Sequence, residues 1–296
     1  MALEGTDPVA RHKRLVRAGL VSWASLVYVF LFAPIVLLVL FSFNANKYGT
    51  LPITGWTTHW YTDAFHNEQI KEAVEETLKI ALEVTAIATV VGTAAAFPLV
   101  RSHIPFRSGL RVGLILPILI PGLLIGVSLL SFFTSVLHVA LSSQTAVIGQ
   151  SVYVTPFVLL VVASRLEGFD RSLERAASDL GANSWQVLRK IVLPLLAPAI
   201  VAGALFAFTL SLDEFVITLF LIGGGNTLPI YIYTQVKFGI TPEVNAVATM
   251  LIASSLTIGA IGLSLPSLIR RARVAIAAAR RTRGAALPAS AATARR

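Results

Sequence analysis

The sequence contains no cysteine and few charged residues, and both shortages restrict its class. Without cysteine the chain can form neither a disulfide framework nor a thiolate metal site. Asp, Glu, Lys and Arg make up 13% of the 296 residues, whereas hydrophobic residues make up 55% and the mean hydropathy is +0.77. A water-soluble domain of this length needs more charge to cover its surface. The composition therefore predicts an all-α polytopic membrane protein.

Patterns for catalysis and metal binding are also missing. The phosphate-binding pattern G-x-x-x-x-G-K-[ST] does not occur, and the glycine run at 223–225 lacks the lysine and the strand–loop–helix setting of a nucleotide cradle. The histidines fall in separate segments without metal-ligand spacing: His12, His59, His66, His103 and His138. We therefore expect no catalytic residue, metal or cofactor in this chain, and we interpret the glycine run as a flexible outer turn.

Six apolar runs approach the roughly 20 residues that a helix needs to cross the hydrocarbon layer of a membrane. The expected spans are residues 19–43, 77–100, 110–136, 146–163, 195–222 and 244–265. The first follows a basic segment, as the core of a signal peptide does, but it is too long and lacks a small-residue cleavage site, so we interpret it as an uncleaved span. This predicts an N-terminal tail at 1–18, a six-helix domain at 19–266, and a basic, disordered tail at 267–296.

Several residues within and between these spans predict local features. Lys79 and Glu83 lie four residues apart and predict an ion pair near the outer end of the second span. Pro117 and Pro121 predict a bend in the third span, because proline leaves backbone carbonyls unpaired. Polar loops are expected at 44–76 and 223–245. The first loop contains aromatic residues that suit the membrane interface, Trp56, Trp60 and Tyr61. The second loop ends in a sequence typical of a helix start, Thr241, Pro242 and Glu243.

The basic residues are distributed unevenly across the expected topology. Twenty of the 24 Lys and Arg residues fall in segments on the same side as the N-terminus, and Lys47, Lys71 and Lys237 fall on the other side. The positive-inside rule then places both termini in the cytoplasm. The net charge of +9 is therefore interpreted as a topology signal and not as a nucleic-acid surface.

A polar stretch at 171–194 separates the fourth and fifth spans. Residues 173–180 have helical spacing, Gly181 can take the positive φ that ends a helix, and Asn183 or Ser184 can cap a second helix that runs to Lys190. The stretch therefore predicts two short helices, joined by a glycine turn, outside the bilayer.

The spacing of this stretch resembles the EAA loop of permease subunits of bacterial ABC importers. The matching residues are Ala176, Ala177, Gly181, Ile191, Leu193 and Pro194. Arg175 stands where the pattern has its leading glutamate, and Glu174 comes one residue earlier. The resemblance implies that this segment, the coupling loop (171–194), docks on a separate ATPase, which binds ATP and Mg. Arg175 and Asp179 are expected to pair at the rim of that contact.

Two adjacent carboxylates, Asp213 and Glu214, fall inside the fifth expected span. Ionisable residues at that depth are costly and usually face a bundle interior or a watery path. Adjacent helical residues point about 100° apart, so the two carboxylates have different neighbours. Asp213 shares its face with Phe206 and Thr209, which suits an organic cation. Two readings remain open: a cation path or a structural hydrogen bond.

A second resemblance concerns SLDEFVITLF and LPIYIYTQVKFGITPEVNAVAT, which are similar to the second permease of spermidine/putrescine-type importers. The matching residues are Leu228, Pro229, Ile232, Tyr233, Val236, Gly239, Pro242, Glu243, Asn245 and Ala246. The resemblance implies a type I ABC importer permease core at about 73–266 in a bacterial inner membrane, with Tyr233 in the substrate path. It also implies a second homologous permease, two ATPase copies and an extracytoplasmic binding protein.

Competing functions follow from the same residues. Permeases for other small amines, such as opines or aminoethylphosphonate, share much of this pattern. A proton-coupled secondary carrier would use the membrane acids as a relay and would need no ATPase. A membrane scaffold would bind a partner without transport.

Overall fold

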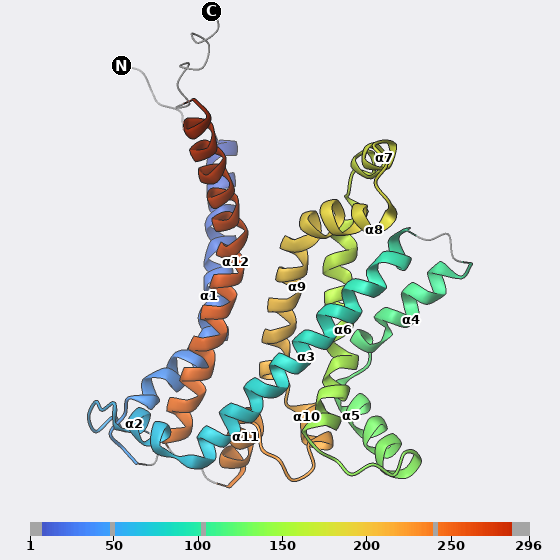
Figure 1. Ribbon diagram of the computed structural model, residues 1–296. Coiled ribbons are helices and arrows are strands. Elements are labelled where there is room, and N and C mark those ends of the chain that lie inside the picture. The colour runs from blue at the N-terminus through green and yellow to red at the C-terminus, as the bar shows by residue number, and fades with distance from the viewer. Residues whose placement is uncertain (1–7, 48–50, 102–104, 239–241, 286–296) are drawn as a thin grey trace, which may run out of the picture. The chain divides into compact units, whose positions relative to one another are not determined.

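The computed structural model describes residues 8–47, 51–101, 105–238 and 242–285, and within these ranges the chain is almost entirely helical (Figure 1). The α-helices are α1 (Pro8–Ser42), α2 (His59–His66), α3 (Glu68–Arg101), α4 (Arg107–Leu119), α5 (Gly122–Ser131), α6 (Ser143–Glu167), α7 (Ser172–Asp179), α8 (Ser184–Val187), α9 (Leu193–Asp213), α10 (Val216–Leu221), α11 (Leu228–Phe238) and α12 (Pro242–Ala285). Two π-helical segments, η1 (Phe132–Val136) and η2 (Leu188–Val192), complete them. The all-α prediction is confirmed.

Five helical segments of the described chain are long and apolar enough to cross a membrane: His12–Ser42, Glu68–Arg101, Ser143–Glu167, Ser184–Asp213 and Pro242–Gly262. A sixth span results if Ser108–Leu119 and Gly122–Val136 are counted together, although these two helices are bent by 100°. The break lies at Ile120 and Pro121, where Ile120 leaves the helical region with ψ 127°. The bend predicted from the prolines is therefore a sharp break.

The described chain divides into two compact units, which we describe separately. The first comprises Met1–Lys71 and Ile232–Ile252, and the second comprises Glu72–Tyr231 and Ala253–Arg296. α12 crosses the boundary that was expected at residue 266 and continues as a helix to Ala285. The rest of the expected tail, 286–296, and Thr241 of the expected helix start lie outside the described residues.

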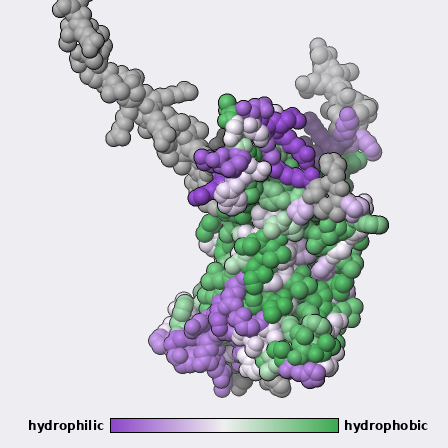
Figure 2. Space-filling model, turned by 45° about the vertical axis from the view of Figure 1, so that its right-hand side comes forward, coloured by the Kyte–Doolittle hydropathy of each residue, from purple (hydrophilic) through white to green (hydrophobic). Residues whose placement is uncertain are grey.

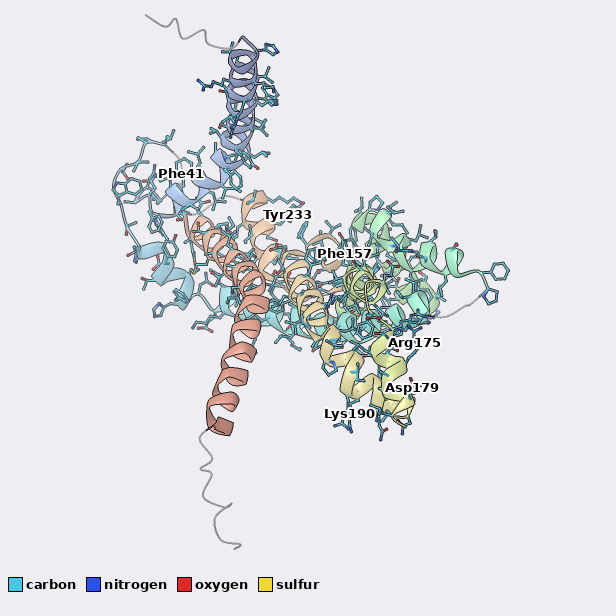
Figure 3. All side chains as sticks on the ribbon, turned by 90° about the horizontal axis from the view of Figure 1, so that it is seen from above. Phe41, Phe157, Arg175, Asp179, Lys190 and Tyr233 are labelled. Carbon is cyan, nitrogen blue, oxygen red and sulfur yellow. The ribbon has the colours of Figure 1, made fainter. Side chains whose placement is uncertain are left out.

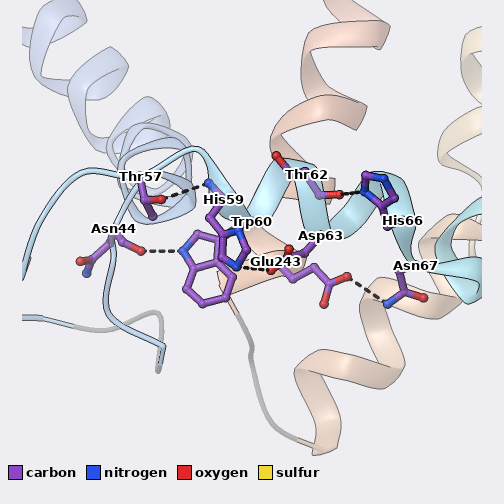
Figure 4. Close-up of polar contacts among 9 residues, drawn as sticks. All are labelled: Asn44, Thr57, His59, Trp60, Thr62, Asp63, His66, Asn67 and Glu243. Carbon is purple, nitrogen blue, oxygen red and sulfur yellow. Dashed lines mark hydrogen bonds and ion pairs between the residues drawn. The ribbon is translucent and has the colours of Figure 1, made fainter.

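The loop expected at 44–76 is more ordered than the sequence indicated. It contains α2, and α3 begins at Glu68 because the side chain of Asn67 accepts hydrogen bonds from the backbone N–H groups of Gln69 and Ile70. The Asn67 amide also donates to Glu243 at 2.9 Å, which joins the start of α3 to the start of α12 (Figure 4).

Aromatic residues of the same loop join the start of α2 to the end of α1. The Trp60 indole N–H donates to the carbonyl of Asn44 at 2.7 Å (Figure 4). The Tyr61 hydroxyl forms a hydrogen bond with the Ser42 hydroxyl at 2.7 Å. Trp56, in contrast, is 66% exposed. The first unit therefore has an ordered polar end, stabilised by hydrogen bonds from these aromatic side chains.

The core of the second unit is built around α6. Val154, Val158 and Val162 of α6 are fully buried, and α6 packs against α9, α10, α5 and α4. Glycine permits the closest approaches: a Cβ on Gly92 of α3 would lie 2.9 Å from Val158, and one on Gly203 of α9 would lie 3.1 Å from the same residue. α6 is therefore the central helix on which the second unit assembles.

The polar side chains of α3 make contacts other than the predicted ones. Lys79 lies 3.8 Å from Glu76, one turn earlier, and Glu83 instead accepts a hydrogen bond from Gln144 at 3.0 Å. The predicted Lys79–Glu83 pair is wrong because Gln144, which is distant in sequence, reaches Glu83 from the start of α6.

The glycine run at 223–225 follows α10, and the segment expected as an outer loop at 223–245 contains α11. Gly223 has φ +70°, and a Cβ there would lie 2.6 Å from the carbonyl oxygen of Leu141. Gly224 has no heavy atom near the position of a Cβ. The interpretation of the whole run as a flexible turn is therefore too simple, because Gly223 is fixed by a close backbone approach.

We expect Gly223→Ala to destabilise the second unit, whereas Gly224→Ala is neutral. A non-glycine residue in the left-handed region costs about 1–3 kcal/mol, and the Leu141 carbonyl must also move. Gly224→Ala changes the free energy of unfolding by less than about 0.5 kcal/mol. Thermal unfolding of the two purified variants in the same detergent measures the difference, and equal midpoints would contradict the assigned role of Gly223.

Candidate functional site

The coupling loop begins with α7, which ends in a hydrogen-bonded glycine motif. Gly181 has φ +84°, as predicted, and its N–H donates to the carbonyl of Ser178 at 2.9 Å. The N–H of Ala182 donates to the carbonyl of Ala177 at 3.0 Å. These two bonds form a Schellman motif, which satisfies carbonyl groups at the end of α7. Ala177 is therefore part of the turn that sets the direction of the next helix.

The second helix of the coupling loop is continuous with a membrane span. The side chain of Asn183 accepts from the N–H of Gln186 at 2.9 Å, and the Gln186 side chain accepts from the N–H of Asn183 at 3.0 Å, which forms a capping box. From this cap the helix passes through η2 into α9 and ends at Asp213. It therefore extends beyond the predicted end at Lys190, through Ile191, Leu193 and Pro194.

The start of α7 is held by Asp170. Its carboxylate accepts hydrogen bonds from the backbone N–H of Ser172 at 2.9 Å and from the Ser172 hydroxyl at 2.8 Å. These bonds, the backbone one first, lower the pKa of the Asp170 carboxyl below its ordinary value. The entry to the coupling loop therefore carries a fixed negative charge at the N-terminal end of α7, where it is favourable.

Apolar side chains are exposed on the coupling loop among its charges. Leu180 is 89% exposed and Trp185 is 64% exposed, and α7 has no buried residue. Figure 2 shows hydrophilic side chains gathered at the end of the second unit that carries α7 and α8, next to the hydrophobic side chains of the spans. Large apolar side chains exposed within a polar surface are typical of a protein contact.

The charged residues of the coupling loop differ in their surroundings. Arg175 and Asp179 are exposed, and in the described part of the chain no ion pair joins them, so the predicted rim pair is not formed (Figure 3). Glu174 is instead paired with Arg101 at the end of α3, at 2.9 and 2.5 Å. No local pattern predicts this pair, because its members are separated by 73 residues.

The fifth expected span is broken at its carboxylates. α9 ends at Asp213, Glu214 is extended with ψ 116°, and α10 begins at Val216. The Glu214 carboxylate accepts from the backbone N–H groups of Ile217 at 2.8 Å and Thr218 at 2.9 Å, and from the Thr218 hydroxyl at 2.7 Å. The prediction of one continuous helix through 195–222 is wrong, because Glu214 caps the start of a new one.

A buried polar network continues from this cap into α6. Thr218 accepts a hydrogen bond from the Gln150 amide at 2.6 Å, and the amide oxygen of Gln150 accepts one from the Ser211 hydroxyl. Gln150, Ser211 and Thr218 are all buried. The network joins α6, the end of α9 and the start of α10. Sequence reasoning missed Gln150, although a glutamine in an apolar span is a detectable signal.

Asp213 faces a cavity at this break, the carboxylate pocket. The pocket has a volume of about 340 Å³ and is lined by Gly122, Tyr153, Leu210, Asp213, Glu214, Phe215, Val216 and Ile217. Gly122 follows the break between α4 and α5, so two helix breaks meet here. Asp213 is exposed, and no hydrogen bond or ion pair engages its carboxylate within the described residues. Both acids line the pocket, but the Glu214 carboxylate is engaged in hydrogen bonds with its own chain, whereas that of Asp213 is not in the described part of the chain.

The other predicted path residues lie in two places. Phe206 packs edge-to-face on Phe157 with ring centroids 5.6 Å apart, and Phe157 packs on Tyr153 at 5.5 Å. These rings extend from the carboxylate pocket along α6 and α9. Thr209 is half-buried, and its hydroxyl donates to the Leu205 carbonyl of its own helix. Tyr233 belongs to the first unit and is 44% exposed on α11.

The long apolar helices, the broken spans and the polar helix pair between two spans are features of a subunit that crosses a membrane several times. The chain belongs to the family described as binding-protein-dependent transport system inner membrane component, which residues 88–274 match. It is therefore a permease subunit of an ABC importer, a multi-pass inner-membrane protein without catalytic function of its own. The resemblance stated for about 73–266 is confirmed at the level of the family.

Individual relatives agree with this assignment. The chain is 37% identical to spermidine/putrescine transport system permease protein PotC of Escherichia coli (strain K12) over 247 residues, which cover 82% of this chain and 90% of PotC. It is 36% identical to putrescine transport system permease protein PotI of the same strain over 254 residues, which cover 83% and 90%.

Solved structures show the same fold at low sequence identity. A chain of a bacterial ABC transporter involved in the import of the acidic polysaccharide alginate has a TM-score of 0.66 at 16% identity, covering 88% of this chain and 96% of that one. A chain of the MetNI methionine ABC transporter has a TM-score of 0.56 at 21% identity, covering 65% and 92%.

We expect Gly181→Pro to abolish uptake without preventing membrane insertion. Proline requires φ near −65° and has no N–H, so it cannot keep the +84° conformation or the bond to Ser178. The turn between α7 and α8 must then change direction. ATP-dependent uptake should therefore be lost, while the amount of protein in the membrane is unchanged.

The control is Gly168→Ala. Gly168 has a negative φ, and a Cβ added there would have no neighbouring atom closer than 3.9 Å. Uptake by Gly168→Ala should equal that of the unmodified chain. Normal uptake by Gly181→Pro would show that the direction of the coupling loop is not needed for transport.

Proposed function

We propose that this permease carries a small organic cation, a polyamine such as spermidine or putrescine, past Asp213. The observation on which the proposal rests is the Asp213 carboxylate, which faces the carboxylate pocket without a protein partner among the described residues. An ionisable group retained within a span is usually functional because its insertion is costly. The names of the relatives PotC and PotI support the polyamine class.

The chemistry around Asp213 suits an ammonium group. α9 ends at Asp213, so the negative end of its helix dipole adds to the carboxylate charge. Tyr153 lines the same pocket, and its aromatic face can attract a cation at about 0.5–2 kcal/mol. A polyamine carries several ammonium groups along a flexible apolar chain. Successive aromatic rings beyond the pocket, Phe157 and Phe206, offer contacts to such a chain.

The coupling loop is proposed to dock on an ATPase dimer that binds ATP and Mg. Its exposed Leu180 and Trp185 supply apolar contact area, and Arg175, Ala176 and Asp179 lie on the same helix pair. The helix that begins at Ser184 in the coupling loop ends at Asp213 in the carboxylate pocket. A push on the loop would therefore reach the pocket through one continuous element.

The remaining partners follow from the transport class. We place both termini and the coupling loop in the cytoplasm, because the basic residues concentrate on that side. A second homologous permease would complete the path, with lipid around the pair, and an extracytoplasmic binding protein would deliver the substrate.

Uptake measurements test the substrate. Labelled spermidine and putrescine are offered to vesicles that contain this chain with its second permease, ATPase and binding protein, with and without ATP. Saturable, ATP-dependent uptake is expected. Stimulated ATP hydrolysis without polyamine uptake would indicate that the substrate is another small amine, such as an opine or aminoethylphosphonate. Uptake driven by a proton gradient without ATP would instead indicate a proton-coupled carrier.

We expect Asp213→Asn to reduce polyamine uptake by about 10- to 100-fold, because a hydrogen bond to a charged group contributes about 1.5–3 kcal/mol. The fold and thermal stability should be unchanged, since no described residue bonds to Asp213. Glu214→Gln should instead lower the thermal unfolding midpoint, because it disturbs three hydrogen bonds.

Glu83→Gln is the matched control for the Asp213 substitution. Glu83 is also a carboxylate in a span, but it bonds Gln144 and does not line the carboxylate pocket. Its uptake should be close to that of the unmodified chain. If Asp213→Asn transports polyamines with an unchanged KM and rate, the carboxylate is not part of the cation path.

A further inference from the structure

The pair between Arg101 and Glu174 has the geometry of a specific connection and not of a chance surface contact. The two guanidinium nitrogens bond the two carboxylate oxygens at 2.9 and 2.5 Å, so the planar fork of arginine meets the carboxylate at both ends. The side chains of Arg101 and Glu174 are 23% and 22% exposed, respectively. Partial removal from water strengthens such a pair and makes the loss of one partner costly.

Aromatic rings enclose the same guanidinium. The guanidinium carbon of Arg101 lies 5.5 Å from the ring centroid of Phe97, one turn earlier on α3. It lies 5.6 Å from the ring centroid of Phe169, just before α7. Arginine stacks on aromatic faces better than lysine does, because its charge is spread over a plane. One ring comes from the span and the other from the segment that leads into the coupling loop. The arginine therefore fixes both Glu174 and the entry to α7.

A second observation concerns how weakly α7 is held by packing. No residue of α7 is buried, and only Ala177 contacts the edge of the hydrophobic core. The Schellman turn attaches α7 to α8 and hence to α9, but it does not attach α7 to α3. Among the described residues, the charged side chains that join α7 to α3 are Glu174 and Arg101.

We propose that Arg101 and Glu174 form a strut that makes α3 move together with the coupling loop. Through the strut, a displacement of α7 reaches two spans, α3 directly and α9 through α8. Arg101, Phe97 and Phe169 are then positioning residues for energy coupling. Glu174 pairs with a residue of its own chain and not with the ATPase. Arg175 and Asp179 remain exposed to a partner. This inference rests on the proposed docking of the coupling loop to the ATPase.

Charge exchange tests the strut in the assembled importer. Arg101→Glu and Glu174→Arg should each lower ATP-dependent uptake about tenfold or more, because like charges then face each other across the pair. ATP hydrolysed per substrate transported should rise, since the ATPase still docks. The double variant, with the charges exchanged, should recover most of the uptake and the original ratio. Arg101→Lys should recover only part, because lysine keeps the charge but lacks the planar fork.

A physical readout makes the test independent of substrate and ATPase. The chain has no cysteine, so a spin label on Asp179→Cys is its only labelled site. The label should become more mobile in each single charge variant and return to the original mobility in the exchanged pair. Arg111→Glu is the matched control, because the Arg111–Glu167 pair is longer, at 3.6 Å, and about half exposed. Its uptake should stay within about twofold of the original.

Two results would overturn the strut. Either both single variants keep normal uptake, ratio and label mobility, or the exchanged pair fails to restore label mobility although it is present in the membrane. If the unmodified importer shows no ATP-dependent uptake, or if its ATPase does not protect the coupling loop from labelling, the proposed function fails instead. Label mobility still reports on the strut in that case.

Discussion

The hydrogen bonds of Glu214 are the interaction on which the arrangement of the second unit depends. A membrane interior tolerates a broken helix only where the freed backbone groups find partners. Here the Glu214 carboxylate accepts hydrogen bonds from backbone N–H groups at the start of α10 and from the Thr218 hydroxyl. Thr218 in turn accepts a hydrogen bond from Gln150, which also bonds Ser211. The break is thereby stabilised in the middle of an apolar packing arrangement. Because α9 stops there, Asp213 stands at a helix end beside a cavity.

The two functional regions lie at opposite ends of one helix. The coupling loop supplies the first turns, capped by Asn183, and the carboxylate pocket borders the last turn, at Asp213. Between them the helix passes through the π-helical turn η2, and Gly203 lets it pack closely on Val158 of α6. Close packing of this kind transmits displacement because interiors are dense and poorly compressible. The strut to α3 adds a second route from the same loop.

Different parts of the chain differ in how far the sequence predicted them. The turn of the coupling loop could be predicted, because its signals are local: Gly181 is needed for a positive φ, and Asn183 caps the helix that follows it. The predicted number of spans, six, agrees with the structure if the bent helix pair is counted as one span. A long apolar run can be recognised without knowing which helices it packs against. Lys79 shows the limit of local signals. Helical spacing predicts Glu83 as its partner, but Glu83 accepts a hydrogen bond from Gln144, which is 61 residues away in the sequence.

The sequence by itself determined the class of protein, the positions of the apolar segments, the turn of the coupling loop and the presence of two acids near the end of the fifth span. Only the tertiary structure decided that Glu214 closes a helix break while Asp213 faces a cavity, that the third span bends by 100°, and that Glu174 pairs with Arg101. The physical reason is the range of the interactions. Caps, turns and hydrophobic runs depend on neighbours within a few residues, whereas these three features depend on which helices approach each other.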